Sequence, residues 1–196
     1  MMLRQNKSVT LIELIIAISL VAVIILGVNS INIFSHYQVV SSDRRAKLQN
    51  EVAFCLEHMT KHISMAIGDV SNDPIVAYSD NRGIRVRIDD NPANGRVDTT
   101  DHWIAYRHIG NQILFFPNAT TSGVPSGSSE VLSNRILTTN LGASTDTWGL
   151  VFSRDPGDNN LVAIVRARWD PATAVSQDNP QVSMQTSVDL PSVSIN

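Results

Sequence analysis

The sequence predicts an α+β protein in which one long N-terminal helix packs on an antiparallel β-sheet. Three observations indicate this fold: an apolar run comes first, a helical pattern of apolar residues continues it, and short alternating segments separated by turn residues follow. We therefore divide the chain of 196 residues into four parts. They are a leader at residues 1–8, an apolar helix at 9–28, its amphipathic continuation at 29–70 and a β-rich head at 71–196.

The residues from Val9 to Val28 are almost all apolar, and a helix of about 20 residues crosses the ~30 Å hydrocarbon core of a bilayer. The leader contains Arg4 and Lys7 but no acidic residue. The positive-inside rule therefore predicts a single-pass protein with a cytoplasmic N-terminus. Glu13 interrupts the apolar run. A carboxylate in a membrane helix costs about 2.5 to 3.5 kcal/mol on insertion scales, so we expect it to have a partner or a function.

The segment from Ser8 to Glu13, SVTLIE, resembles the cleavage and methylation motif of type IV prepilins and type II secretion pseudopilins. The resemblance implies that a prepilin peptidase cuts between Ser8 and Val9, and that the new N-terminus of Val9 is methylated. Glu13 would then be the fifth mature residue, and its carboxylate would neutralise the amino terminus of a neighbouring subunit during assembly. Glycine is usual at the position of Ser8 and phenylalanine at that of Val9, but the first remains small and the second apolar.

This resemblance implies a structural subunit of a type II secretion pseudopilus or a type IV pilus. The subunit would start in the inner membrane with its head in the periplasm and later join the filament. Its partners would be the prepilin peptidase, other pilin or pseudopilin subunits and the inner-membrane assembly platform. A single cysteine and the absence of a kinking proline at Ser30 favour a minor, J-type or W-type subunit, with a major subunit as the next candidate, while Glu13 argues against the tip pseudopilin. The alternative is a signal-anchored periplasmic binding domain with no filament role.

The second helical part contains no proline or glycine between Asn29 and Gly68. Its apolar residues recur at alternating spacings of four and three, at Val52, Leu56, Met59, Ile63 and Ile67. This spacing predicts one buried stripe, which helix-breaking residues from Gly68 to Pro74 bring to an end.

Three further side chains of this helix invite a chemical interpretation. Cys55 lies beside the stripe, so we expect it in the core and without a disulfide partner in this sequence. His58 and His62 are four residues apart, which is half of a zinc site. Met59 stands where a catalytic zinc helix has glutamate, so we expect a solvated helix face instead.

The head contains short segments that end at turn residues. In these segments apolar and polar residues alternate, or most residues are apolar. Gly110-Asn111 predicts a tight hairpin, and the composition of Thr120 to Ser129 predicts a flexible loop. We predict strands at Ile84–Ile88, Trp103–Ile109, Gln112–Phe116, Val131–Leu137, Leu150–Ser153, Leu161–Trp169 and Val182–Val188.

An acidic turn runs from Asp89 to Asp101. Four of its residues have the oxygen spacing of a weak calcium loop, namely Asp90, Asn94, Asp98 and Asp101. Pro92 occupies a ligand position, however, and aspartate replaces the usual bidentate glutamate. The other interpretation is a polar turn between strands, which we favour, with calcium as the alternative.

Other functional classes find no support in the sequence. The formal net charge of −3 does not favour nucleic-acid binding. The chain has no nucleophile elbow, no phosphate-binding glycine loop and no metal-ligand set with complete spacing. We therefore expect no enzymatic activity and, calcium apart, no cofactor.

Overall fold

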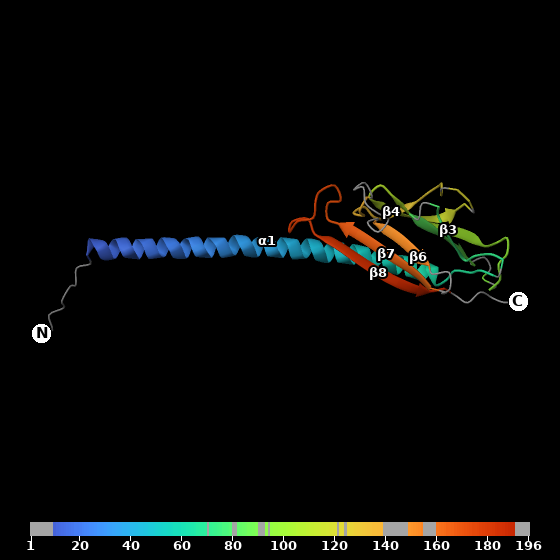
Figure 1. The fold of residues 1–196 in the computed structure, drawn as a ribbon, viewed down its shortest axis with the longest axis horizontal. Helices are drawn as coiled ribbons and strands as arrows, with labels where there is room; N and C mark the ends of the chain where they lie inside the picture. The colour runs from blue at the N-terminus through green and yellow to red at the C-terminus, as the bar shows by residue number, and fades with distance from the viewer. Residues whose placement is uncertain are drawn as a thin grey trace. The chain divides into compact units, whose positions relative to one another are not determined.

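The computed structural model describes residues 10–69, 71–79, 82–89, 93, 95–120, 122–123, 125–138, 149–154 and 160–190. Within them the chain forms one helix followed by strands (Figure 1), which confirms the predicted α+β class. The elements are α1 (Leu11–Ile63), β1 (Ile75–Ala77), β2 (Gly83–Ile88), β3 (His102–Ile109), β4 (Gln112–Ala119), β5 (Glu130–Ser133), β6 (Leu150–Arg154), β7 (Asn160–Arg168) and β8 (Gln181–Asp189). The chain divides into two compact units, one ending at Ser42 and the other beginning at Asp43, and each is described by itself.

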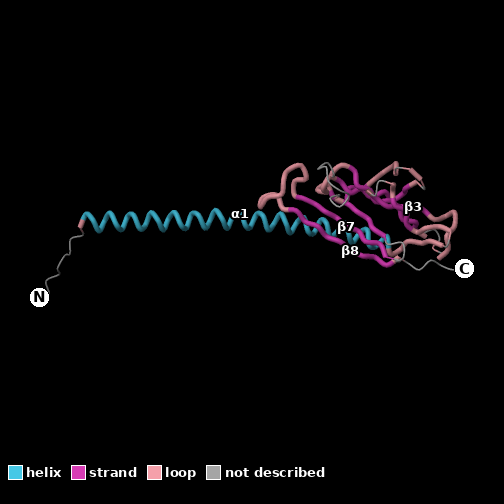
Figure 2. Tube along the Cα trace, viewed as in Figure 1, coloured by secondary structure: helices cyan, strands magenta, loops and turns pink. Residues whose placement is uncertain are grey.

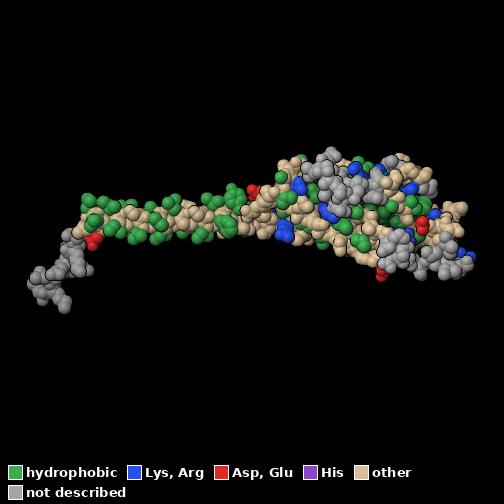
Figure 3. All heavy atoms as spheres, in the orientation of Figure 1, with side chains coloured by type: hydrophobic (Ala, Val, Ile, Leu, Met, Phe, Trp, Pro, Cys, Tyr) green, Lys and Arg blue, Asp and Glu red, His purple; other side chains and the backbone are tan. Residues whose placement is uncertain are grey.

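The first unit consists, in its described part, of the N-terminal segment of α1. Hydrophobic side chains cover this segment on the face seen in Figure 3. Every large apolar side chain from Leu11 to Val28 is more than half exposed. The helix satisfies its backbone hydrogen bonds internally, as a segment in lipid must. Its side chains, by contrast, find no apolar partners within the described residues and need them from a membrane or from other chains.

The second unit begins within α1, and here the helix has one buried face. Leu48, Val52, Cys55, Met59 and Ile63 are completely buried. These residues follow the predicted stripe of alternating spacing. Propensity alone makes helices only marginally stable, so burial of this stripe supplies most of the stability of this part of α1.

α1 ends at Ile63, earlier than the boundary near residue 70 expected from the glycine and proline positions. The amide of Ala66 donates to the carbonyl of Ile63 over 3.1 Å, so the last turn tightens. The amide of Ile67 then donates to the carbonyl of Arg87 over 3.0 Å, and Ala66 forms a bridge with Ile88. The chain therefore leaves the helix because strand β2 offers its backbone other hydrogen-bond partners.

In its described residues the head contains two antiparallel sheets, where the sequence suggested one. The first has the strand order β1-β2-β3-β4-β5 and the second the order β6-β7-β8. Figure 2 shows the strands of the head in magenta and α1 in cyan. After β5, the amide of Leu137 donates to the carbonyl of Arg166 over 3.1 Å, and Ile136 forms a bridge with Ala167. The predicted strand at Val131–Leu137 is therefore split, since its first part pairs with β4 and its last part with β7.

The other predicted strands are present with small changes in their ends. The hairpin at Gly110-Asn111 is confirmed, because Ile109 pairs with Gln112 and Gly110 has a φ of 62°. Strand β1 was not predicted, since three residues are too few to show an alternating pattern.

One hydrophobic core joins the second part of α1 to both sheets. The five-stranded sheet contributes Tyr106 of β3 and Ile113 of β4 to this core, and the three-stranded sheet contributes Val165 of β7. All three side chains are completely buried. A smaller cluster of Tyr78, Ala105 and Phe116 is separate from this core. Since the second part of α1 contributes to the main core, its removal would expose apolar core side chains of both sheets to water.

Candidate functional site

The beginning of α1 carries the side chains that the sequence analysis connected with assembly. Thr10 precedes the helix, and its hydroxyl oxygen accepts a hydrogen bond from the amide of Glu13 over 3.3 Å. In return, Oε2 of Glu13 accepts a hydrogen bond from the amide of Thr10 over 2.8 Å and from its hydroxyl over 2.9 Å. This reciprocal arrangement is a capping box, which satisfies amides that the first turn of a helix leaves free.

The capping box explains why the helix begins at this point. Thr10 is the N-cap residue, and Glu13 places its negative charge in the first turn, where the helix dipole favours it. The role of Thr10 was missed in the sequence analysis, which treated it only as part of the processing motif. The threonine followed three residues later by glutamate is the signal that could have revealed it.

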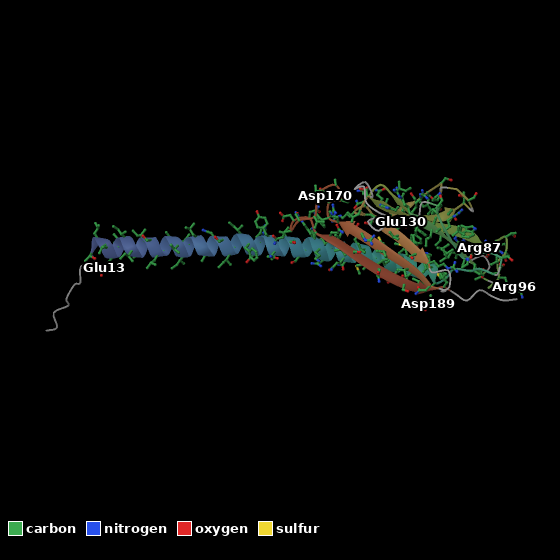
Figure 4. The ribbon with its side chains drawn as sticks, in the orientation of Figure 1. Glu13, Arg87, Arg96, Glu130, Asp170 and Asp189 are labelled. Carbon is green, nitrogen blue, oxygen red and sulfur yellow. The ribbon has the colours of Figure 1, made fainter. Side chains whose placement is uncertain are left out.

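The surroundings of Glu13 are apolar, and Figure 4 shows it at the start of α1. Leu11, Ile12 and Leu14 are 77%, 66% and 55% exposed, so they form an apolar surface around a carboxylate. Glu13 forms no ion pair within the described residues. In lipid, the capping contacts would satisfy part of the hydrogen-bonding capacity of the carboxylate, but they would not neutralise its negative charge.

A membrane span fits this part of the chain. Among the described residues, α1 is the one helix long and apolar enough to cross a bilayer, and it lies near the N-terminus. Ser8 and Val9, the predicted cleavage position, lie outside the described residues, so cleavage between them and methylation of Val9 stay predictions.

The acidic turn is only partly visible. Asp90 and Asn94 lie outside the described residues. Oδ1 of Asp98 accepts hydrogen bonds from the amide and hydroxyl of Thr100, and Oδ2 of Asp101 accepts one from the amide of Asp98 over 2.9 Å. These are the local contacts of a polar turn. No group of three or more metal-binding side chains is found among the described residues, and calcium binding stays a prediction.

His58 and His62 of α1 do not form the solvated face that we expected. Both are partly buried against Tyr106, whose hydroxyl lies 2.9 Å from Nδ1 of His58 and 2.8 Å from Nδ1 of His62. The ring of Phe115 stacks on His62 at a centroid distance of 5.3 Å. Burial, and then the neighbouring His62, lower the pKa of His58. The pair therefore belongs to the packing between α1 and the five-stranded sheet.

Cys55 lies in the core, as its position beside the stripe predicted. Its side chain is completely buried, and burial raises the pKa of its thiol to about 12. The thiol is therefore protonated at neutral pH and unsuited to nucleophilic chemistry.

Comparison with known protein families identifies the N-terminal segment. Residues 3–29 match the prokaryotic N-terminal methylation motif, and they include the capping box and the apolar part of α1. Comparisons with curated proteins and with solved structures find no match. The chain thus carries the prepilin-type cleavage and methylation motif at its N-terminus, and this pilin-like segment includes an apolar helix long enough to span a membrane.

Proposed function

We propose that the chain is a minor pilin or pseudopilin, a structural subunit of a type II secretion pseudopilus or a type IV pilus. The observation that carries this proposal is the match to the methylation motif at residues 3–29, which includes a helical segment whose large apolar side chains are exposed from Leu11 to Val28. A helix that is apolar on all sides is stable only in lipid or against other apolar helices. The filament supplies the second of these surroundings after the membrane has supplied the first.

Glu13 is the assembly residue in this proposal. Prepilin peptidase would cut between Ser8 and Val9 and leave the amino group of Val9 at the membrane. That cation and the carboxylate of Glu13 on a neighbouring subunit are each costly in an apolar environment, so pairing them removes both costs and sets the register of the subunits. The capping box supports this role, because it holds the carboxylate at the first turn of the helix.

The topology follows from the charges around the apolar segment. Arg4 and Lys7 favour a cytoplasmic leader, so the head would enter the periplasm. The inner-membrane assembly platform would then move the processed subunit into the filament. We propose no enzymatic role, since the motif is one of structural subunits.

Mass spectrometry of the chain from cells with an active prepilin peptidase tests the first step. We expect a mature N-terminus at Val9 carrying one methyl group. An N-terminus at Met1 in such cells would contradict the proposal and leave the signal-anchored binding domain as the better explanation.

Incorporation into filaments tests the second step. We expect the methylated chain to copurify with filaments in a smaller amount than the major subunit. A methylated chain that stays in the membrane fraction while filaments form without it would contradict the filament role.

A further inference from the structure

We propose that the free edge of strand β8 binds an extended strand from the head of a neighbouring subunit. The inference rests on the filament role proposed above. It goes beyond that role because it assigns a contact to the head, whereas the methylation motif concerns only the N-terminal helix.

The four sheet edges of the head differ in length and charge. Strands β1, β5 and β6 are edges of three, four and five residues, and the last two carry Glu130 and Arg154. Strand β8 is an edge of nine residues, and its one charge is Asp189 at its end. Natural proteins protect sheet edges by making them short or by placing charges and prolines on them. Three edges follow this rule, and β8 does not.

The register of β8 identifies the backbone groups that point away from the sheet. The amide of Trp169 donates to the carbonyl of Pro180, and the paired register continues from Arg168 opposite Gln181. Since hydrogen-bonded pairs alternate along an antiparallel ladder, alternate residues of β8 direct their amide and carbonyl groups to the outer side. These residues are Gln181, Ser183, Gln185, Ser187 and Asp189.

Independent contacts on β7 agree with this register. The amides of Arg166 and Arg168 donate to Gly149 and Arg135, on the side of β7 away from β8. Their partners Ser183 and Gln181 are therefore not bonded to β7 through the backbone. The described part of the chain places no further strand beside β8, so this row of donors and acceptors is open.

A groove of about 370 Å³ runs between this edge and α1. Its walls combine the first half of β8 with one flank of the helix, and its lining includes Gln49, Asn50, Ala53, Ser183 and Met184. Ala53 leaves room beside the helix, and the two amide side chains can donate and accept hydrogen bonds. Arg45 is the one charged residue of the lining.

This chemistry selects a polypeptide strand as the occupant. Backbone amides and carbonyls at the spacing of a β-strand are matched by another extended backbone. A lining with Arg45 as its one charged residue offers too little charge to select an anionic lipid or a nucleic acid. One wall of the groove is α1, the helix whose N-terminal segment carries the assembly motif. A neighbouring subunit in the filament is therefore the partner, and its strand would extend the three-stranded sheet.

Hydrogen exchange measured by mass spectrometry compares the full chain in detergent micelles with the same chain in purified filaments. We expect the outward amides of Gln181, Ser183, Gln185 and Ser187 to exchange at least tenfold more slowly in filaments. The peptide that contains β6, the opposite edge of the same sheet, serves as the internal control and should change little. Protection of β8 alone supports the inference. Equal exchange of β8 in both samples overturns it and leaves the filament role intact.

A charge on the edge provides the second test. Gln185→Lys should reduce incorporation into filaments about tenfold, because a lysine on an edge strand opposes strand addition. Ser153→Lys on the β6 edge is the matched control, since Ser153 is also exposed. Both variants should keep the melting temperature of the parent chain. Normal incorporation of Gln185→Lys overturns the inference, and absence of the unmodified chain from all filaments overturns the filament role together with it.

Discussion

The two parts of α1 are similar in secondary structure but opposite in what surrounds their apolar residues. Leu20 and Leu26 in the first unit are 60% and 68% exposed, whereas Leu48 and Met59 in the second unit are completely buried. In the first part apolar residues occupy all faces, and in the second they occupy one stripe. The difference shows that the first part depends on a membrane or on neighbouring chains, while the second part stabilises the head.

The largest expected effect comes from removing the charge in the first part. Glu13→Ala should lower incorporation into filaments by a hundredfold or more, since breaking a buried ion pair costs about 3 to 5 kcal/mol. The melting temperature of the head should not change, because Glu13 lies in the other unit. Quantitative immunoblotting of purified filaments measures incorporation.

Two control variants separate the charge from its surroundings. Thr10→Ala removes the two hydrogen bonds of the Thr10 hydroxyl but keeps the carboxylate and its bond from the Thr10 amide, so we expect a loss of about 1 kcal/mol, roughly fivefold in incorporation. Glu57→Ala removes an exposed carboxylate from the second part of α1 and should have no effect. If Glu13→Ala assembled normally, the assembly role of the first part would be wrong.

A truncation in the buried stripe tests the second part. Met59→Ala should lower the free energy of unfolding by about 2 to 5 kcal/mol, because it leaves a cavity in the core shared with both sheets. Leu20→Ala removes an exposed apolar group in the first part and should leave that free energy unchanged. Urea unfolding of the chain in micelles, followed by tryptophan fluorescence, measures both. Equal effects of the two variants would remove the distinction between the two parts.

The sequence predicted the elements of this protein better than their arrangement. The stripe from Val52 to Ile63 and the hairpin at Gly110 depend on local spacing and local backbone conformation, so they could be read directly. The helix end at Ile63 and the division into two sheets depend on long-range pairing with Arg87 and Ala167, which no local pattern contains.

The candidate site shows the same limit. Glu13 was identified because a charge in an apolar run is conspicuous, and its capping box with Thr10 is encoded within four residues. The burial of His58 and His62 was not predicted, because it requires Tyr106 and Phe115 from strands far along the chain. A spacing of four residues could not tell a solvated face from a packed one.

A smaller effect is expected from this histidine cluster. Burial lowers the pKa of His58 in the folded chain, so below about pH 6.5 the unfolded state binds a proton more readily than the folded state. The contribution of His58 to stability is therefore complete above that pH and is lost as the pH falls. His62 and Lys61 act in the same direction as burial, and Glu130 opposes them. The melting temperature of the head should fall between pH 7 and pH 5.

His58→Gln tests this assignment because it keeps a polar side chain but cannot titrate in this range. We expect a flatter dependence of the melting temperature on pH, measured by circular dichroism. Tyr106→Phe, which removes the hydroxyl bonded to the histidines, should cost about 1 kcal/mol at pH 7. An unchanged pH dependence in His58→Gln would show that other groups control it.

The last expected effect concerns calcium, and it tests whether the core alone stabilises the second unit. Asp98 and Asp101 already accept hydrogen bonds from the turn, so any calcium site would compete with these contacts and bind weakly. At a calcium concentration tenfold above a millimolar dissociation constant, binding would add about 1.4 kcal/mol to the free energy of unfolding. Calorimetric titration and the melting temperature, compared between the parent chain and Asp101→Asn, measure this contribution. If calcium raises the melting temperature of the parent chain and Asp101→Asn abolishes this rise, the head is a metal-stabilised domain. The two units would then differ in a bound ligand as well as in their apolar surroundings. No heat and no rise in melting temperature would leave the polar turn as the full explanation of the acidic residues, with the shared core as the source of the head's stability.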